Sequence, residues 1–491
     1  MLDPDISTAE ARRLLTVGNH VGNHVGNHVG NDAAHLSRRR FLQAVGAGLV
    51  GSAVLTATEQ RMFGLGQAWA GAPIGPTDGI LVTIMMFGGN DGLNTVVPYT
   101  DARYYERRGA LAVPPEQVLA LDGSFGLHPN LPYLKSLWDA DQLAIVHGSG
   151  YPNPDLSHFS SMATWMQGRH GGGNGTGWVG RWLDGQPGAD SDLLAATIGT
   201  SVPLHMAGAV RRAVAIPEWG DLFGTDTEPP DLRMYSGLRA MSSAGAGRGP
   251  WHDMFARTLR SELDLAADVA PVFGTAVGSD GLALQLTIAA RLLNANLGLR
   301  SIDVGLGGFD THHGQPFQHN ALMTELDAGI GAFFAELAPE FRNRVTIMTL
   351  SEFGRTLYAN GSAGTDHGTA NVQFVLGAGV NGGHYGQPPS LDTDDQWERL
   401  ASTVDFRSVI GSVIDGWMGG GGSTVVNGGF EDLGLFKAGP GGTPPAGTSP
   451  PVIMPPSAPT AYTPITPVRV FDTRRGEGGR PDHCDVERHT A

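Results

Sequence analysis

Residues 345–368 read VTIMTLSEFGRTLYANGSAGTDHG, and the fold can be inferred outward from this stretch. The run 345–350 is apolar and rich in β-branched side chains, which predicts a buried strand. Polar residues follow directly, including Glu352 and Arg355. Ligands of open α/β sheets bind at the carboxyl ends of the strands, so these side chains are candidates for a functional site.

The same stretch ends in an acidic residue and a histidine, Asp366 and His367, between Gly364 and Gly368. Neighbouring residues on a regular strand point to opposite faces. The flanking glycines allow the backbone to bend, so that a carboxylate and an imidazole can face one target. We therefore expect a loop that presents both side chains to a site.

Two further predicted strands end in ligand-type residues. Residues 79–87 (GILVTIMMF) precede a glycine-rich turn with Asp91, and the strand 301–306 precedes GGFDTHHGQ, which contains Asp310 and His312. Two residues apart on an extended segment, Asp310 and His312 share one face. Carboxylate and neutral imidazole together suit zinc, manganese or another divalent ion. The alternatives are a turn in which Asp91 caps the next element and a loop in which the histidines are only hydrogen-bonded.

A fourth candidate lies at the start of a predicted helix, in the sequence GYPNPDLSHFSS of residues 150–161. Ser157 falls where this helix should begin. A helix N-terminus concentrates unpaired N–H groups and positive dipole, so it can hold an anion or stabilise an alkoxide nucleophile. The alternative is that Ser157 only caps the helix, with His158 packed beneath Trp165.

Strands and amphipathic helices alternate between residues 79 and 418. Apolar residues recur at helical spacing in 282–297 and 322–337, and a last helix is predicted over 405–417. This alternation predicts an α/β fold, a three-layer sandwich in which helices cover both faces of a mostly parallel central sheet.

Composition limits the classes of function. The 491 residues are 41% hydrophobic, which is enough for a large core, and their formal net charge is -16. Binding to a phosphate backbone needs clustered Lys and Arg, so nucleic acid is excluded as a main partner. The single cysteine, Cys484, lies near the end of the sequence and leaves no disulfide framework or cysteine-ligated zinc in the folded body.

Residues 1–70 are interpreted as a short repeat followed by an export signal. The sequence SRRRFLQ at 37–43, a mildly apolar run at 44–57 and AWA at 68–70 together resemble a twin-arginine (Tat) signal peptide that is cleaved before Gly71. The Tat translocase is then the expected partner during export. The apolar run is too short for a membrane anchor, so no stable transmembrane segment is expected after cleavage. Repeated VGNH units precede the signal, and their Gly and Asn oppose a metal-binding helix.

The C-terminal part is predicted to be an appendage. Residues 71–436 would form the main domain and 437–465 a Pro/Gly-rich linker. Residues 466–491 resemble the opening strand of a small repeated β module of secreted actinobacterial proteins. Because too little of that module is present to fold, a truncated and disordered fragment is expected.

Six motifs in this order resemble the exported protein family called domain of unknown function 1501. They are GGNDGLNTVVPY at 88–99, SHF at 157–159, FDTHHGQ at 309–315, SEFGRT at 351–356, GTDHG at 364–368 and VDFRSVIGSVIDGW at 404–417. That family is grouped by fold with the alkaline phosphatase and sulfatase superfamily. The resemblance implies an alkaline-phosphatase-like central sheet between helical layers, with a divalent metal centre at the strand ends.

The resemblance also implies roles for individual residues. In that superfamily the Asp after the first strand binds metal and a Ser or Thr at a helix start is the nucleophile, which implies these roles for Asp91 and Ser157. An Asp-His pair after the penultimate strand is replaced here by Ser351 and Glu352. No stretch supplies the C/S-x-P-x-R motif of sulfatases, which argues against a sulfatase. The implied metal ligands are Asp91, Asp310, His312, Glu352, Asp366 and His367.

Together these features predict an exported metal-dependent hydrolase of a phosphate-type (or sulfate-type) ester, which is periplasmic, cell-wall-associated or extracellular. Zinc or manganese, as one or two divalent ions, would activate Ser157 or water. Arg355 or a second metal would stabilise charge on the transferring group, unless Arg355 only forms a salt bridge. The expected substrate is a small-molecule or envelope-polymer ester. The alternative is a catalytically silent metal-binding module that binds a cell-envelope component or a partner protein.

Overall fold

The computed structural model describes residues 70–170, 175–188, 193–220, 226–243, 250–274, 280–392 and 397–442. Within these ranges the main sheet has nine strands. Eight of them follow the order β11-β5-β10-β9-β1-β8-β6-β7, and the ninth, β12, pairs with β5. The strands are β1 (Ile80–Phe87), β5 (Leu143–Gly150), β6 (Ala195–Ile198), β7 (Val214–Ile216), β8 (Ser301–Gly307), β9 (Val345–Leu350), β10 (Asn371–Leu376), β11 (Gly383–Tyr385) and β12 (Val404–Asp405).

One strand of this sheet opposes the others. β10 runs antiparallel to both β5 and β9, whereas the remaining pairs are parallel. β1 lies between β8 and β9, with Leu81 opposite Ser301 and Ile80 opposite Val345. The carboxyl ends of these three strands therefore meet at one edge of the sheet, as the sequence predicted.

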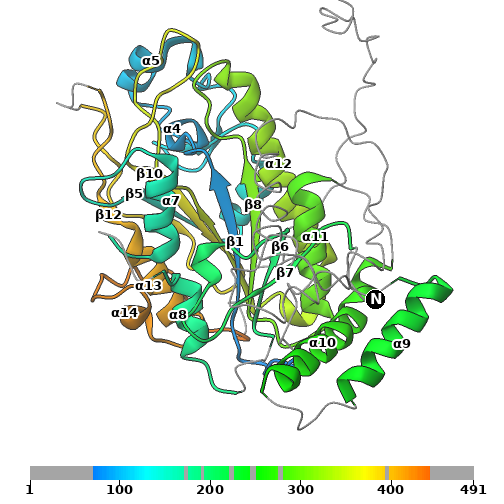
Figure 1. The fold of residues 1–491 in the computed structure, drawn as a ribbon. Coiled ribbons are helices and arrows are strands. Elements are labelled where there is room, and N and C mark those ends of the chain that lie inside the picture. Colours follow the sequence, from blue (N-terminus) through cyan, green and yellow to red (C-terminus); the bar gives the residue numbers. More distant parts are fainter. Residues whose placement is uncertain are drawn as a thin grey trace, which may run out of the picture.

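Helices cover both faces of the sheet (Figure 1). Alternate residues of β1 belong to the two hydrophobic cores on opposite faces of the sheet. Ile80, Val82 and Ile84 pack on one face, and Leu81 and Met85 pack on the other. Burial on both faces explains the nearly continuous apolar sequence of this strand. This confirms the predicted three-layer α/β sandwich. One layer holds α6 (Pro132–Asp139), α11 (Gly281–Asn294) and α12 (Gln315–Glu336), and the other holds α7 (His158–Gln167), α8 (Trp178–Asp184), α13 (Phe406–Gly416) and α14 (Gly422–Val425).

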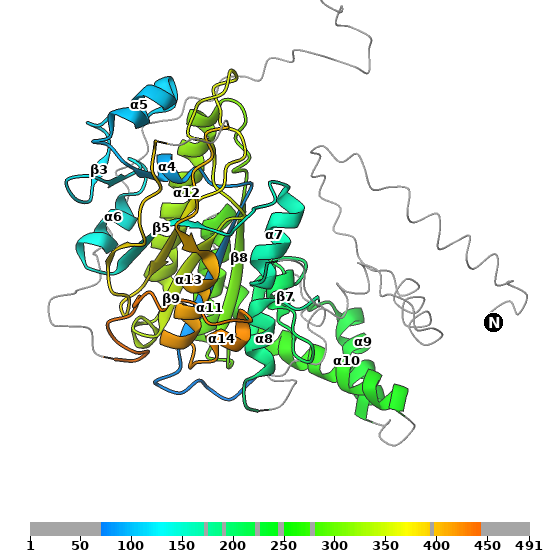
Figure 2. The ribbon, with the colours of Figure 1, turned by 90° about the vertical axis from the view of Figure 1, so that its left-hand side faces the viewer.

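Smaller elements surround the sandwich. A second sheet of order β2-β4-β3 lies on the chain between β1 and β5, and α9 and α10 pack against each other at one side of the molecule (Figure 2). Their bounds are α4 (Gly92–Thr95), β2 (Val96–Val97), α5 (Ala102–Arg108), β3 (Leu119–Ala120), β4 (Gly126–Leu127), α9 (Pro229–Ser243) and α10 (Pro250–Val269). Single 3-10 turns are Gly109–Leu111, Leu204–Met206, Ala270–Phe273 and Pro339–Phe341.

The predicted strand 345–350 coincides with β9, whereas one helix begins earlier than predicted. The apolar spacing suggested a start near residue 322, but α12 begins at Gln315 and has a proline in its first turn. Proline suits that position because the first N–H groups of a helix have no partner within the helix. The early start places the N-terminus of α12 close after Asp310 and His312.

Several sequence predictions concern residues outside the described ranges. The VGNH repeat and the export signal fall in residues 1–69, and most of the linker and the C-terminal fragment fall in residues 443–491. Among the helices that the structure describes, none is both long and apolar enough to cross a membrane.

Candidate metal centre

The loops after β1, β8 and β9 and the start of α7 meet at the carboxyl edge of the sheet. The first two loops are in close contact, because a Cβ placed on Gly88 would lie 2.4 Å from the backbone nitrogen of Asp310. Gly88 also has a φ of +117°, which side-chain-bearing residues rarely adopt. Glycine at this position therefore lets the β8 loop bring Asp310 into the site.

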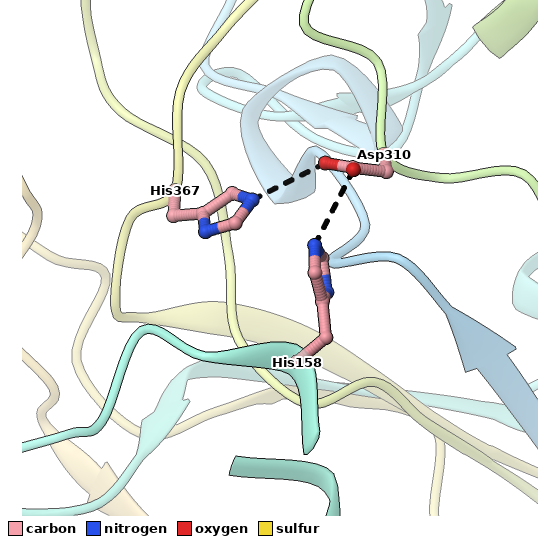
Figure 3. A group of neighbouring side chains, drawn as sticks. All are labelled: His158, Asp310 and His367. Atoms are coloured by element: carbon pink, nitrogen blue, oxygen red, sulfur yellow. Dashed lines mark hydrogen bonds and ion pairs between the residues drawn. The ribbon is translucent and has the colours of Figure 1, made fainter. Parts of the chain in front are cut away.

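Three histidines and one carboxylate converge in this place. Asp310 Oδ1 lies 3.0 Å from His312 Nε2 and 3.2 Å from His367 Nε2, and these two nitrogens are 3.0 Å apart. His158 Nε2 approaches the other carboxylate oxygen, Asp310 Oδ2, at 3.4 Å. Figure 3 shows His158 and His367 pointing at the Asp310 carboxylate from α7 and from the loop after β9.

The second nitrogen of each ring is held by an acceptor. His312 Nδ1 lies 2.9 Å from Asp366 Oδ1, and His158 Nδ1 lies 2.9 Å from Glu352 Oε1. His367 Nδ1 lies 2.8 Å from the carbonyl oxygen of residue 156. Because these oxygens accept, each Nδ1 carries a proton, which in a neutral ring leaves the lone pair of Nε2 facing the centre.

This arrangement fits a divalent ion. Donors bound to one tetrahedral zinc ion, with bonds of about 2.0–2.2 Å, lie about 3.3 Å from one another. Three of these contacts, between Asp310 Oδ1, His312 Nε2 and His367 Nε2, span 3.0 to 3.2 Å, and His158 Nε2 lies 3.4 Å from the other oxygen, Asp310 Oδ2. Where the three rings are neutral and Nδ1 carries the proton, the Nε2 lone pairs and the carboxylate are all acceptors, and a cation is the partner that they share. A cation would satisfy all four groups.

The charges around the site favour protonation states in which Asp310 and His367 can bind a metal. Burial opposes ionisation of Asp310, but the hydrogen bond and charge of Arg355 outweigh it and lower the pKa of this carboxyl to about 2. Burial also lowers the pKa of His367, and the charge of Arg355 acts in the same direction. At neutral pH, Asp310 is therefore an anion and His367 is neutral.

Arg355 is placed differently from the expectation that it contacts the transferring group. Its side chain is fully buried and donates to the carbonyl oxygens of Gly88, Gly89, Phe309 and residue 365, besides donating to Asp310 Oδ1 at 2.7 Å. The guanidinium thus joins the loops after β1, β8 and β9 and holds the carboxylate of Asp310. In this position Arg355 is a positioning residue.

Asp91 is not among the converging donors. Its carboxylate forms a two-pronged ion pair with Arg108, in which Nη2 lies 2.9 Å from Oδ1, and it also accepts from Gln315. Both charged side chains are buried, with Asp91 1% and Arg108 0% exposed. Burial opposes ionisation of Asp91, but Arg108 outweighs that effect and lowers its pKa. The cation beside Asp91 in this structure is therefore a guanidinium.

Two other expected ligands lie behind the histidines. Glu352 is 2% exposed and accepts from the N–H of Gly88 as well as from His158, so it orients the ring of His158. Asp366 does the same for His312 and is itself held by the hydroxyl of Tyr358. Such acceptors fix the ring orientation and tautomer of histidine ligands.

Ser157 is the residue before α7, and its side chain makes no capping hydrogen bond. It is exposed, so its hydroxyl is free for other contacts. The next residue, His158, was not predicted as a ligand but as a packing residue. The sequence signal was present, since His158 lies within the fourth candidate motif, GYPNPDLSHFSS, but the periodicity does not tell which residue at a helix start faces the site.

The profile of a family described as "Protein of unknown function (DUF1501)" matches residues 143–408, more than half of the chain. The chain belongs to this family. The match confirms the resemblance drawn from the sequence motifs and includes His158, Asp310, His312 and His367, whereas Asp91 lies before it. A search of curated proteins gave no match.

Solved structures overlap loosely with this chain. Ps i-CgsB in complex with k-i-k-neocarrahexaose has a TM-score of 0.32 and 10% identity, and the overlap covers 72% of this chain and 73% of that one. The alkaline phosphatase of the Antarctic bacterium TAB5 has a TM-score of 0.26 and 12% identity over 62% and 92%. The lipoteichoic acid synthase LtaP of Listeria monocytogenes has a TM-score of 0.28 and 8% identity over 82% and 80%. Scores this low support no inference about activity.

Proposed function

We propose that this protein is an exported metal-dependent hydrolase that cleaves a phosphate-type (or sulfate-type) ester. One observation carries the proposal: three imidazoles, each with Nδ1 held by an acceptor, direct their Nε2 atoms at the carboxylate of one aspartate. Histidine and carboxylate ligands with an acceptor behind each ring are typical of zinc centres. Zinc or manganese is the proposed ion.

The proposed ligands are His158, Asp310, His312 and His367. Asp310 contributes one negative charge and neutral imidazoles contribute none, so a centre with a divalent ion keeps net positive charge. That charge favours an anionic ester over a neutral one. A bound ion would supply Lewis-acid stabilisation of the negative charge that develops on the ester oxygens.

The nucleophile is proposed to be Ser157 or a water molecule. Ser157 precedes the ligand His158, is exposed and has no capping bond that would occupy its hydroxyl. The start of α7 also offers unpaired N–H groups and positive dipole, which lower the cost of an alkoxide at that position. Arg355 fixes the carboxylate of Asp310 in the orientation that the ligand set requires.

We propose a single ion. The carboxylate after β1, which the superfamily would use as a metal ligand, is occupied by Arg108. Glu352 and Asp366 are committed to the histidines. Within the described residues, the group of convergent metal-ligating side chains is the one around Asp310.

The export route and the substrate class are also proposals. The paired arginines at 38–40 and the AWA at 68–70 support Tat export, with a periplasmic, cell-wall-associated or extracellular destination. Such a location brings the centre into contact with small-molecule and envelope-polymer esters.

A catalytically silent metal-binding module is the second candidate, and the placement of Arg355 favours it. Hydrolases of phosphate esters commonly use a cationic side chain to clamp the transferring group. Arg355 instead donates its N–H groups to backbone carbonyl oxygens and to Asp310. Such a module would bind an envelope component or a partner protein through the same centre.

The deciding experiment measures metal content and ester hydrolysis on the same preparations. The wild-type protein should retain about one equivalent of zinc or manganese, and Asp310→Ala and His367→Ala should lose it. Ser157→Ala should keep the metal. Turnover of p-nitrophenyl phosphate, bis(p-nitrophenyl) phosphate or p-nitrophenyl sulfate by the wild type, lost in Asp310→Ala, supports the hydrolase.

The remaining outcomes separate the candidates. Loss of turnover in Ser157→Ala with metal retained assigns the nucleophile to Ser157, and retained turnover assigns it to water. Stoichiometric metal with no turnover on any of the three esters favours the silent module. A wild-type protein that takes up no metal overturns both.

A further inference from the structure

A cavity of about 260 Å³ lies beside the metal centre but opens to a different set of side chains. It is formed where α4, the end of β5 and the start of β10 meet residues 388–391 and Leu400. This volume is below the roughly 300–1,000 Å³ typical of drug-sized ligands, so it suits a smaller molecule. Its walls are mostly apolar and include Leu93, Val96, Phe125, Pro388, Leu391 and Leu400.

One buried titratable group lines this cavity and has no role in the metal centre. His147, on β5, is 3% exposed. Its Nε2 lies 2.7 Å from His384 Nδ1, and His384 Nε2 lies 3.2 Å from Asp122 Oδ2. The rings of Phe125 and Trp138 pack against this chain of polar groups.

The positions of the protons in the row Asp122, His384 and His147 follow from the charge of Asp122. Burial opposes ionisation of Asp122, but N–H groups of Phe125 and Ser124 outweigh it and lower the pKa, so Asp122 is an anion that can only accept. Burial lowers the pKa of His384 and lowers that of His147 to about 3, so both rings are neutral at pH 7.

A neutral imidazole ring carries one proton on one of its two nitrogens, so the tautomer of His384 determines the tautomer of His147. His384 Nε2 lies 3.2 Å from the carboxylate of Asp122, whose negative charge favours the proton on that nitrogen, so His384 Nδ1 accepts from His147 Nε2–H. The remaining nitrogen, His147 Nδ1, holds a lone pair. Among the described residues no hydrogen bond to this atom is found, and His147 lines the cavity.

The other polar groups of the wall are already bonded. Arg355 donates to carbonyl oxygens and to Asp310, and Asn371 Nδ2 donates to the carbonyl of Phe353 at 2.8 Å. Arg103 forms a two-pronged ion pair with Asp101. Among the described residues of the wall, no cation is left free for an anionic ligand, and His147 Nδ1 is an acceptor without a donor.

We propose that this cavity is a binding site for a small neutral organic molecule that carries a hydroxyl group. The hydroxyl donates to His147 Nδ1, and the apolar body packs against Leu93, Val96 and Leu400. The site is distinct from the metal centre and does not depend on hydrolase activity, although Arg355 belongs to the walls of both.

Binding is tested by fluorine NMR titration of the full chain with 4-fluorobenzyl alcohol and with 4-fluorotoluene, which has nearly the same shape but no hydroxyl. The alcohol should bind saturably and about tenfold more tightly than the toluene, the usual effect of one hydrogen bond to a buried acceptor. Equal affinities, or no saturable binding of the alcohol, would overturn the proposal.

Two variants locate the site. His147→Phe removes the acceptor but keeps an aromatic ring, so it should abolish the preference for the alcohol. Leu93→Trp should fill the cavity and weaken both probes by more than tenfold, while metal content stays unchanged. A preference that survives in His147→Phe, or unchanged binding in Leu93→Trp, counts against the site.

Nitrogen NMR of the histidine rings adds a test that needs no ligand and no variant. In the free protein, His147 Nδ1 should show the shift of an unprotonated ring nitrogen and His147 Nε2 that of a protonated one. The opposite tautomer would present a donor to the cavity and would contradict the proposal.

Discussion

His312 Nε2 and His367 Nε2 face each other at 3.0 Å, while the Nδ1 atom of each ring contacts a fixed oxygen acceptor. Both Nε2 atoms therefore present lone pairs to the same point, next to the carboxylate of Asp310. In the folded protein without metal, these groups repel one another. A cation between them would remove that repulsion, so we expect metal binding and folding to be coupled.

This coupling predicts a metal-dependent stability. At a free zinc concentration 100-fold above the dissociation constant, binding to the native state alone adds about 2.7 kcal/mol to the free energy of unfolding. Calorimetry with added zinc and with a chelator should therefore give a higher Tm for the zinc sample. His367→Ala should show little difference between the two conditions. Equal Tm values for the wild type would contradict the proposed centre.

The acceptors behind the histidines should control metal affinity without touching the ion. Asp366→Ala frees His312 Nδ1 and removes the contact with Tyr358, so the ring loses its fixed tautomer and orientation. We expect zinc affinity, measured by competition with a chromophoric chelator, to fall about 10- to 100-fold.

Asp139→Ala is the matched control, because its partner is Lys135 on the exposed surface of α6. That change should leave zinc affinity unaltered. If Asp366→Ala also binds zinc normally, then Asp366 does not orient the ligand.

The sequence predicted those features of the site that depend on strand ends. Asp310, His312 and His367 follow buried strands, and parallel strands bring their carboxyl ends to one edge, so their convergence was predictable. The sheet and its two helical layers follow from the same alternation. His158 was missed because adjacent residues at a helix start point in different directions, and only packing decides which one faces inward.

The division between ligands and supporting groups could not be read from the sequence. Glu352 and Asp366 are chemically as good ligands as Asp310, but hydrogen bonds to histidine rings from other segments of the chain determine their role. The same holds for Asp91, whose partner Arg108 is a surface-type residue in sequence and fully buried in the fold. These contacts are set by tertiary structure alone.

A glycine substitution should disturb the centre through the backbone. Gly88→Ala places a Cβ 2.4 Å from the backbone nitrogen of Asp310 and at an unfavourable φ, so the β8 loop must move. We expect a loss of about 2–4 kcal/mol in unfolding free energy and a loss of bound metal.

Gly307→Ala is the control for this change, because it lies in the neighbouring strand end with no atom near its added Cβ. It should bind metal like the wild type. Urea unfolding and metal analysis of both variants make the comparison. Normal metal content in Gly88→Ala would show that the close loop contact does not position Asp310.

A buried acid far from the centre should make stability depend on pH. Glu262, on α10, is 2% exposed, and burial raises its pKa to about 9 from 4.5. Between these two values the folded protein keeps a proton that the unfolded chain releases, so the stability that this proton contributes is complete below pH 4.5 and is lost as pH rises toward 9. Glu262→Gln removes this loss and should stabilise the protein by about 1–3 kcal/mol at pH 8.

The measurement is urea unfolding of wild type and Glu262→Gln at pH 5 and pH 8. The difference between the two proteins isolates Glu262 from other titrating groups. It should be near zero at pH 5 and clearly in favour of the variant at pH 8. A difference that does not change with pH would mean that Glu262 titrates normally.

The ion pair of Asp91 with Arg108 gives the sharpest test of a single-metal centre. Both side chains are buried, so Arg108→Ala leaves an uncompensated carboxylate and should cost about 3–5 kcal/mol of stability. The double variant Arg108→Leu/Asp91→Leu should recover much of this loss, because it leaves no buried charge unpaired. Both forms should still bind about one equivalent of zinc, since neither residue belongs to the ligand set. If Asp91→Leu alone released zinc as completely as Asp310→Ala does, Asp91 would be a ligand and the ion pair would have to open when metal binds.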